Sequence, residues 1–190
     1  MIKNSDTKKD KMSPKGDIWI SAVLYMALGI IVIALILAAS LPLIDRLKDR
    51  NTMTETKKLL VTTDETIKIV AREGPGSQRE LSPLTVNKGQ LFIDEKNDTI
   101  AWKMKTSAPL LEPNIVIKEG VLSLLLAPTP VKDEYLITMG LSYHNDINLT
   151  LVSDYKSPFM GKYTVVITHT GTYTTLPTGE TMPIIAIRIN

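Results

Sequence analysis

The apolar stretch that follows Asp17 limits the structures that this sequence can adopt more than any other feature does. Residues 18–44 carry no formal charge, and about 20 such residues suffice to cross a hydrocarbon core of about 30 Å. Water cannot satisfy backbone amides and carbonyls at that depth, so the stretch must be helical. The residues before it are rich in lysine, and a basic flank predicts that the N-terminus stays in the cytoplasm. We therefore expect a transmembrane helix over 18–44.

The junction in front of this helix reads Lys15-Gly16-Asp17. Secretory signals are cut behind an apolar region of about 7–15 residues, whereas here a Lys-Gly pair stands in front of a longer one. The arrangement resembles the class III signal peptide of type IV pilin-like proteins (prepilins), especially those of archaea, over the first third of the chain. The resemblance implies that a prepilin peptidase cuts between Gly16 and Asp17. Residues 1–16 would then be a cleaved basic leader, and residues 17–73 a long N-terminal helix.

One position departs from the bacterial members of that family, which usually carry Glu at the fifth mature position. The fifth residue after Gly16 is Ser21. Archaeal members commonly lack this Glu, so the departure favours the archaeal branch. It also leaves no buried carboxylate to neutralise the amino terminus of a neighbouring subunit.

Two other interpretations of the N-terminal region stay open. An uncut signal-anchor that tethers an exported domain has the same charges and the same hydrophobicity. An ordinary secretory signal cut near Ala38-Ala39-Ser40 is also compatible with the small residues there, although its apolar region would be unusually long.

The helix is expected to continue beyond the membrane. Residues 45–72 form an amphipathic stretch in which Leu60, Thr63, Ile67 and Val70 recur at helical spacing on one face. Gly74-Pro75-Gly76 should end it, since proline removes a donor and glycine admits positive φ. Within the apolar part, Pro42 lacks an amide proton and predicts a kink.

From Leu81 onward the pattern changes to a period of two, as in Ile100, Trp102 and Met104, which indicates a half-buried strand. An acidic hairpin turn is expected at Asp94–Asp98. Further strands are expected at 115–117, 121–126, 135–143, 147–152, 163–170 and 184–189. Short strands at near-regular spacing suggest a sandwich or a barrel. The predicted fold is α+β: the long helix followed by an antiparallel β-sandwich-like or barrel-like extracellular head over 77–190.

Little in the sequence suggests catalysis. There are no cysteines, and the two histidines, His144 and His169, come without a metal-binding motif. We expect neither an enzyme nor a metal or other cofactor. The net charge of +2 comes from mixed signs, so no nucleic-acid partner is expected. Two sequons, at Asn97 and Asn148, are possible N-glycosylation sites of an exported domain.

The resemblance to pilins implies a structural subunit of an extracellular filament. The subunit would first be a single-pass membrane protein and would then polymerise, with its helices forming the core of the filament and its heads forming a surface whose contacts would include adhesion. Partners would be other copies, the membrane, the prepilin peptidase, an assembly ATPase and a platform membrane protein. The alternative is a membrane-tethered β domain that binds a ligand. Small residues would let helices approach closely: Ser21, Ala22, Ala27, Gly29, Ala34, Ala38 and Ala39.

Overall fold

Among the described residues, one helix, α1 (Pro14–Glu73), precedes eight strands. The computed structural model describes residues 14–177 and 179–190, with side chains of α1 described from residue 19. The chain forms two units that meet at Asp45 and Arg46. The second unit, residues 46–190, is called the head unit here; it contains the second half of α1 and all the strands.

Helix α1 runs through Gly29 and Pro42 without interruption; a bend at Pro42 stays a prediction. The helix ends at Glu73, before Gly74 and Gly76, which have φ values of 88° and 82°. The Ser77 hydroxyl donates to the carbonyl of Val70 at 2.8 Å, so a carbonyl of the last turn gains a partner. The helix stop predicted from Gly74-Pro75-Gly76 is confirmed.

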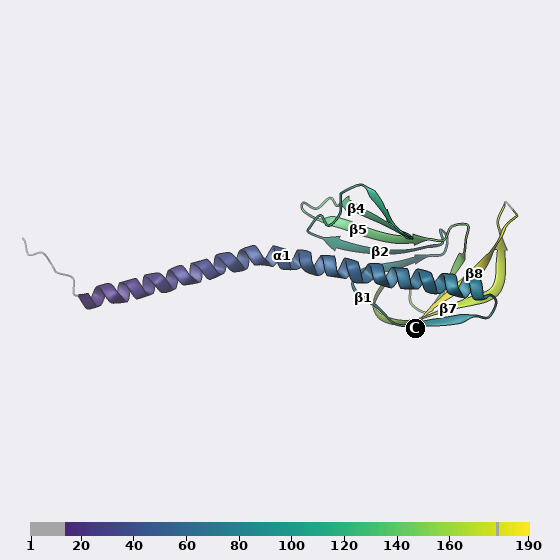
Figure 1. The fold of residues 1–190 in the computed structure, drawn as a ribbon, viewed down its shortest axis with the longest axis horizontal. Helices are drawn as coiled ribbons and strands as arrows, with labels where there is room; N and C mark the ends of the chain where they lie inside the picture. The colour runs from purple at the N-terminus through teal and green to yellow at the C-terminus, as the bar shows by residue number, and fades with distance from the viewer. Residues whose placement is uncertain (1–13, 178) are drawn as a thin grey trace, which may run out of the picture. The chain divides into compact units, whose positions relative to one another are not determined.

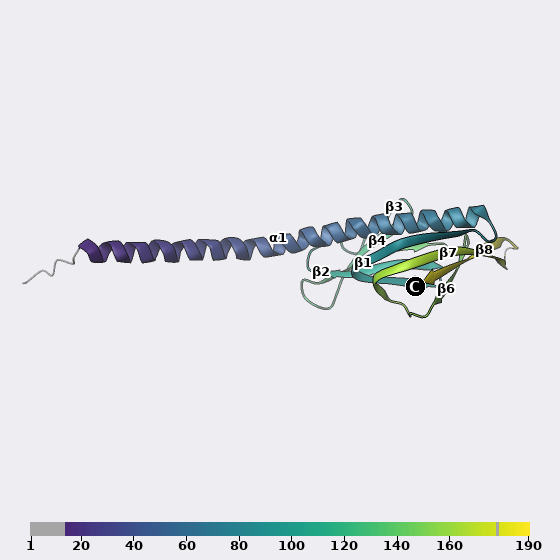
Figure 2. The ribbon, with the colours of Figure 1, turned by 90° about the horizontal axis from the view of Figure 1, so that it is seen from below.

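The strands of the head unit form one curled sheet in the order β3-β4-β5-β2-β1-β7-β8-β6. All neighbours are antiparallel except β6 and β8, which are parallel. Figure 2 shows the second half of α1 along one face of this sheet. The strand bounds are β1 (Gln78–Asp94), β2 (Thr99–Thr106), β3 (Val116–Glu119), β4 (Leu122–Pro128), β5 (Tyr135–Ser142), β6 (Asn148–Ser153), β7 (Phe159–Thr175) and β8 (Thr181–Ile189).

This architecture confirms the predicted α+β class, with a long helix followed by a barrel-like head. In Figure 1, β2, β4 and β5 lie on one side of α1, and β1 and β7 lie on the other. The sheet is therefore a half-barrel around the helix. The parallel pair was not expected from the sequence. It arises because β7 and β8 form a hairpin with each other, and β6 joins the far side of that hairpin at β8.

The core lies between the second half of α1 and the concave face of the sheet. Leu60, Ile67 and Val70 are 0% exposed and Thr63 is also buried, which confirms the predicted helical face. Across from them, the alternating residues of β2 are buried as predicted. A small cavity of about 20 Å³ lies between α1 and the sheet, with Leu60, Thr63 and Ile100 in its lining.

Charged side chains of α1 also bind the sheet. Asp49 is 4% exposed and forms an ion pair with Lys88 of β1. Lys57 pairs with Glu119 of β3 at 2.6 Å. The Asp49 carboxylate is removed from water and requires such a partner, so its pair with Lys88 favours one position of the helix along the sheet, whereas the more exposed pair of Lys57 with Glu119 contributes little.

A second buried carboxylate of α1, Asp64, binds Lys68 on its own helix at 2.9 Å. The side chain of Tyr143 is buried near it. Burial first, and then the negative charge of Asp64, raises the pKa of the Tyr143 hydroxyl far above its ordinary value. The phenol therefore stays neutral in the folded head unit, where its charged form would be desolvated.

Candidate membrane and assembly helix

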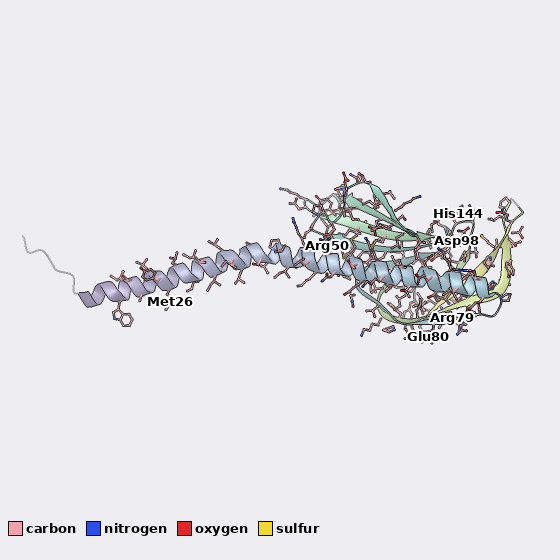
Figure 3. All side chains as sticks on the ribbon, viewed as in Figure 1. Met26, Arg50, Arg79, Glu80, Asp98 and His144 are labelled. Carbon is pink, nitrogen blue, oxygen red and sulfur yellow. The ribbon has the colours of Figure 1, made fainter. Side chains whose placement is uncertain are left out.

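The first half of α1 exposes nearly all of its apolar side chains. Trp19 and Tyr25 are 76% and 75% exposed, and no residue of the most apolar window of the helix is buried by the rest of the chain. Figure 3 shows side chains, Met26 among them, projecting all around this part of the helix. An apolar surface of this extent is not left in water by soluble monomers, so a lipid or protein environment must cover it.

Helix α1 is, among the described residues, the one helix long and apolar enough to cross a membrane. Its apolar run is uncharged from residue 18 to residue 44, longer than the about 20 residues that a bilayer requires. This agrees with the predicted transmembrane helix and with anchoring of the chain in a membrane.

Five of the seven small residues named above fall on two sides of the helix, and Ser21 and Ala39 share a third. At 3.6 residues per turn, Ala22 and Gly29 lie within about 20° of each other around the axis, whereas Ala27, Ala34 and Ala38 lie within about 40° of each other. The centres of the two groups are separated by about 150° in the same projection. A Cβ atom added at Gly29 would meet no other atom within 4 Å. Within one chain, therefore, nothing requires a glycine at this position.

The Ser40 hydroxyl donates to the Ile36 carbonyl at 2.7 Å, inside the same helix. The Ser40 hydroxyl thus has a hydrogen-bond partner within its own helix and needs none from a second chain. Pro42, two residues further on, has no amide to give to the Ala38 carbonyl, so this turn of the helix makes one backbone hydrogen bond fewer.

The predicted processing site, Lys15-Gly16-Asp17, belongs to the first turn of α1, where only the backbone is described. Residues 1–13 of the predicted leader lie outside the described residues. Cleavage between Gly16 and Asp17 remains a prediction.

The two histidines of the head unit have different surroundings. His144 is exposed in the turn between β5 and β6. His169 of β7 is buried; its Nδ1 accepts the Gly171 amide at 3.0 Å, and its ring contacts Tyr173 edge-on. Among the described residues, no group of three histidine, aspartate or glutamate side chains is arranged to hold a metal ion.

The two sequons, 51 positions apart in the chain, meet at one end of the head unit. Asn97 is exposed in the turn between β1 and β2, and Asn148 is half-buried at the start of β6. The middle residues of the two sequons are bonded, since the Leu149 amide donates to Asp98 Oδ1 at 2.8 Å. Asn97 lies in the turn expected at Asp94–Asp98; whether either asparagine carries a glycan stays a prediction.

The two buried carboxylates of α1, Asp49 and Asp64, were not predicted from the sequence. A signal for one of them exists, because Asp49 lies 14 residues before Thr63 and 21 before Val70, on the same seven-residue spacing of the apolar face. A charge at such a position predicts a partner from another element. Its identity, Lys88, required the three-dimensional structure.

Comparison with known proteins gives no relative. No family model, no curated protein and no solved structure matches this chain.

Proposed function

We propose that this protein is a structural subunit of an extracellular filament of the type IV pilin kind, and that α1 carries its function. The observation behind the proposal is the first half of α1, an apolar helix longer than a bilayer needs, with small residues on two of its sides. Lipid covers such a helix before assembly, and the equivalent helices of other copies cover it afterwards. Each large apolar side chain kept from water contributes about 1.5–3 kcal/mol.

The two groups of small residues support lateral contacts with more than one neighbour. A subunit inside a helical bundle needs contacts on at least two sides, whereas a simple anchor needs only hydrophobicity. Small side chains let helix backbones approach each other closely. The Lys15-Gly16 junction supports the same proposal, because removal of the leader frees the helix for assembly.

In this proposal the head unit forms the outer surface of the filament and makes its external contacts, adhesion among them. The proteins that process the subunit and assemble it are a prepilin peptidase, an assembly ATPase and a platform membrane protein. The subunit itself uses no substrate and no cofactor.

A double substitution of small residues tests the proposal. Gly29→Leu with Ala34→Leu adds bulk on both sides of the helix and keeps it hydrophobic. We expect membrane insertion and leader removal to persist while electron microscopy shows few or no filaments. The matched control is Ile30→Leu with Leu37→Ile, which conserves volume on the surface between the two groups and should leave filaments unchanged.

The second candidate function is a β domain permanently tethered to the membrane, and the exposure of α1 supports it as well. It predicts that Gly29→Leu with Ala34→Leu has no effect on any property of the protein. Normal filaments from the double variant would contradict close helix packing. Confinement of the unaltered protein to the membrane fraction as single subunits would favour the tethered domain.

A further inference from the structure

Strand β6 is the last strand at one edge of the sheet. An edge strand presents backbone amides and carbonyls that can pair with a strand of another molecule. Copies anchored in one membrane, or assembled side by side, hold many such edges at high local concentration. The β6 edge is therefore a place where unwanted pairing of head units would begin.

Two amides of β6 are instead bonded by side chains from a distant turn. The Leu149 amide donates to Asp98 Oδ1 at 2.8 Å, and the Leu151 amide donates to Glu95 Oε1 at 2.6 Å. Residues two apart on a strand direct their amides to the same edge. Both carboxylates therefore occupy the edge of β6, where an incoming strand would place its carbonyls.

The turn that supplies these carboxylates, residues 94–98, is itself held in place. Asp94 Oδ1 accepts the Lys96 amide at 2.9 Å, and Asp94 Oδ2 accepts Asn97 Nδ2 at 2.7 Å. The Asn97 side chain and the Lys96 amide hold the pKa of the Asp94 carboxyl below its ordinary value, because both donate hydrogen bonds to its charged form.

Asp98 is fixed from a second direction. Its carbonyl accepts the Tyr143 amide at 2.9 Å, its side chain is buried, and its backbone has φ of 49°. Figure 3 shows Asp98 beside His144 at the end of the head unit where the β1–β2 and β5–β6 turns meet. The carboxylate is thus aimed at Leu149 by the surrounding backbone.

We propose that the 94–98 turn is an edge plug: through Glu95 and Asp98 it closes β6 against strand pairing with a second copy of this chain. Each carboxylate satisfies an amide of the edge, as a partner strand would, yet offers no amide in return and adds a negative charge. The sheet therefore ends at β6. This role is independent of the proposed filament, since a tethered head unit has the same edge.

The test uses the full-length protein in membranes and a single reporter cysteine. Val152→Cys places a thiol on β6, and the chain has no other cysteine, so any disulfide-linked dimer reports two β6 strands close together. Adding Glu95→Ala with Asp98→Ala should raise the yield of dimer severalfold. The matched control, Glu95→Gln with Asp98→Asn, keeps a carbonyl oxygen for each amide and should leave the yield at its original level.

Hydrogen exchange at Leu149 and Leu151 gives a second readout. In solubilised reporter protein kept dilute, so that copies stay apart, these amides should exchange severalfold faster with the alanine pair and at the original rate with the control pair. Unchanged dimer yield and unchanged exchange in the alanine pair would overturn the proposal. An equal rise with both pairs would overturn it too, because the hydrogen bonds would then not be what closes the edge. If the alanine pair fails to fold, Glu95→Ala alone, at an exposed side chain, must give the rise.

Discussion

At the scale of single residues, an irregular segment of β1 combines a glycine with positive φ, a hydrogen bond from Trp102 and an ion pair with α1. The register between β1 and β7 shifts between Val86 and Leu91, and Gly89 lies inside this irregular segment with φ of 83°. The indole nitrogen of Trp102 donates to the Lys88 carbonyl at 2.9 Å. That bond holds the bulge and so presents the Lys88 side chain to the buried Asp49.

Gly89 is the residue that we expect to tolerate substitution least. A Cβ atom there would lie 2.6 Å from the Lys103 carbonyl oxygen and 2.7 Å from the Trp102 ring. Gly89→Ala should therefore destabilise the head unit by about 3 kcal/mol or more, combining the penalty for positive φ with that for overpacking. Urea unfolding of a fragment comprising residues 46–190, followed by Trp102 fluorescence, measures the change.

Gly120→Ala is the matched control for this prediction. Gly120 also has positive φ, but a Cβ atom there would meet nothing within 4 Å. Only the backbone penalty applies, about 1–2 kcal/mol. Equal effects of the two substitutions would show that the contact with Trp102 and Lys103 is not what requires glycine at position 89.

At the scale of elements, the second half of α1 is part of the core of the head unit. Its apolar face is completely covered by the sheet, whereas neighbouring positions such as Ile69 stay 42% exposed. A fragment that begins at residue 77 lacks this face and leaves the concave side of the sheet in water. We expect it to fold less readily than the fragment 46–190.

Leu60→Ala tests this dependence without removing the helix. Leu60 is fully buried and lines the small cavity between α1 and the sheet. Its truncation should lower the free energy of unfolding by about 2–5 kcal/mol, through lost burial and an enlarged cavity. Ile69→Ala, on the exposed side of the same helix, should cost clearly less. A small effect of Leu60→Ala in urea unfolding would mean that the sheet folds independently of α1.

At the scale of the whole molecule, helix α1 belongs to two units that require different environments. The first half of α1 requires an apolar environment, and the head unit requires water around its exposed charges. The chain is therefore expected at a membrane or in an assembly that reproduces the apolar environment of one.

Removal of the leader is the prediction that belongs to this scale. Mass spectrometry of the mature protein should find Asp17 at its N-terminus, and Gly16→Phe should block the cut because a bulky residue replaces the glycine before it. Gly29→Ala, a change at another glycine of α1, is the control and should be processed normally. Met1-containing peptides from the abundant form would support the tethered domain, and an N-terminus at Leu41 would establish a secretory signal.

The sequence by itself determined the elements and the faces that they bury. The helical spacing of Leu60, Ile67 and Val70 and the alternation in β2 are local patterns, and a local pattern suffices to tell which side of an element avoids water. The helix stop at Gly74 and the turn at 94–98 were equally local, because they depend on the backbone freedom of a few residues.

Only the tertiary structure decided which elements become neighbours. The parallel pairing of β6 with β8, the ion pair of Asp49 with Lys88 and the bonds from Glu95 and Asp98 to β6 join residues 36 to 56 positions apart. Periodicity carries no information about such partners, because a carboxylate or an edge amide can be satisfied by many groups. The choice among them follows from how the whole sheet curls around α1, which no single segment of the sequence encodes.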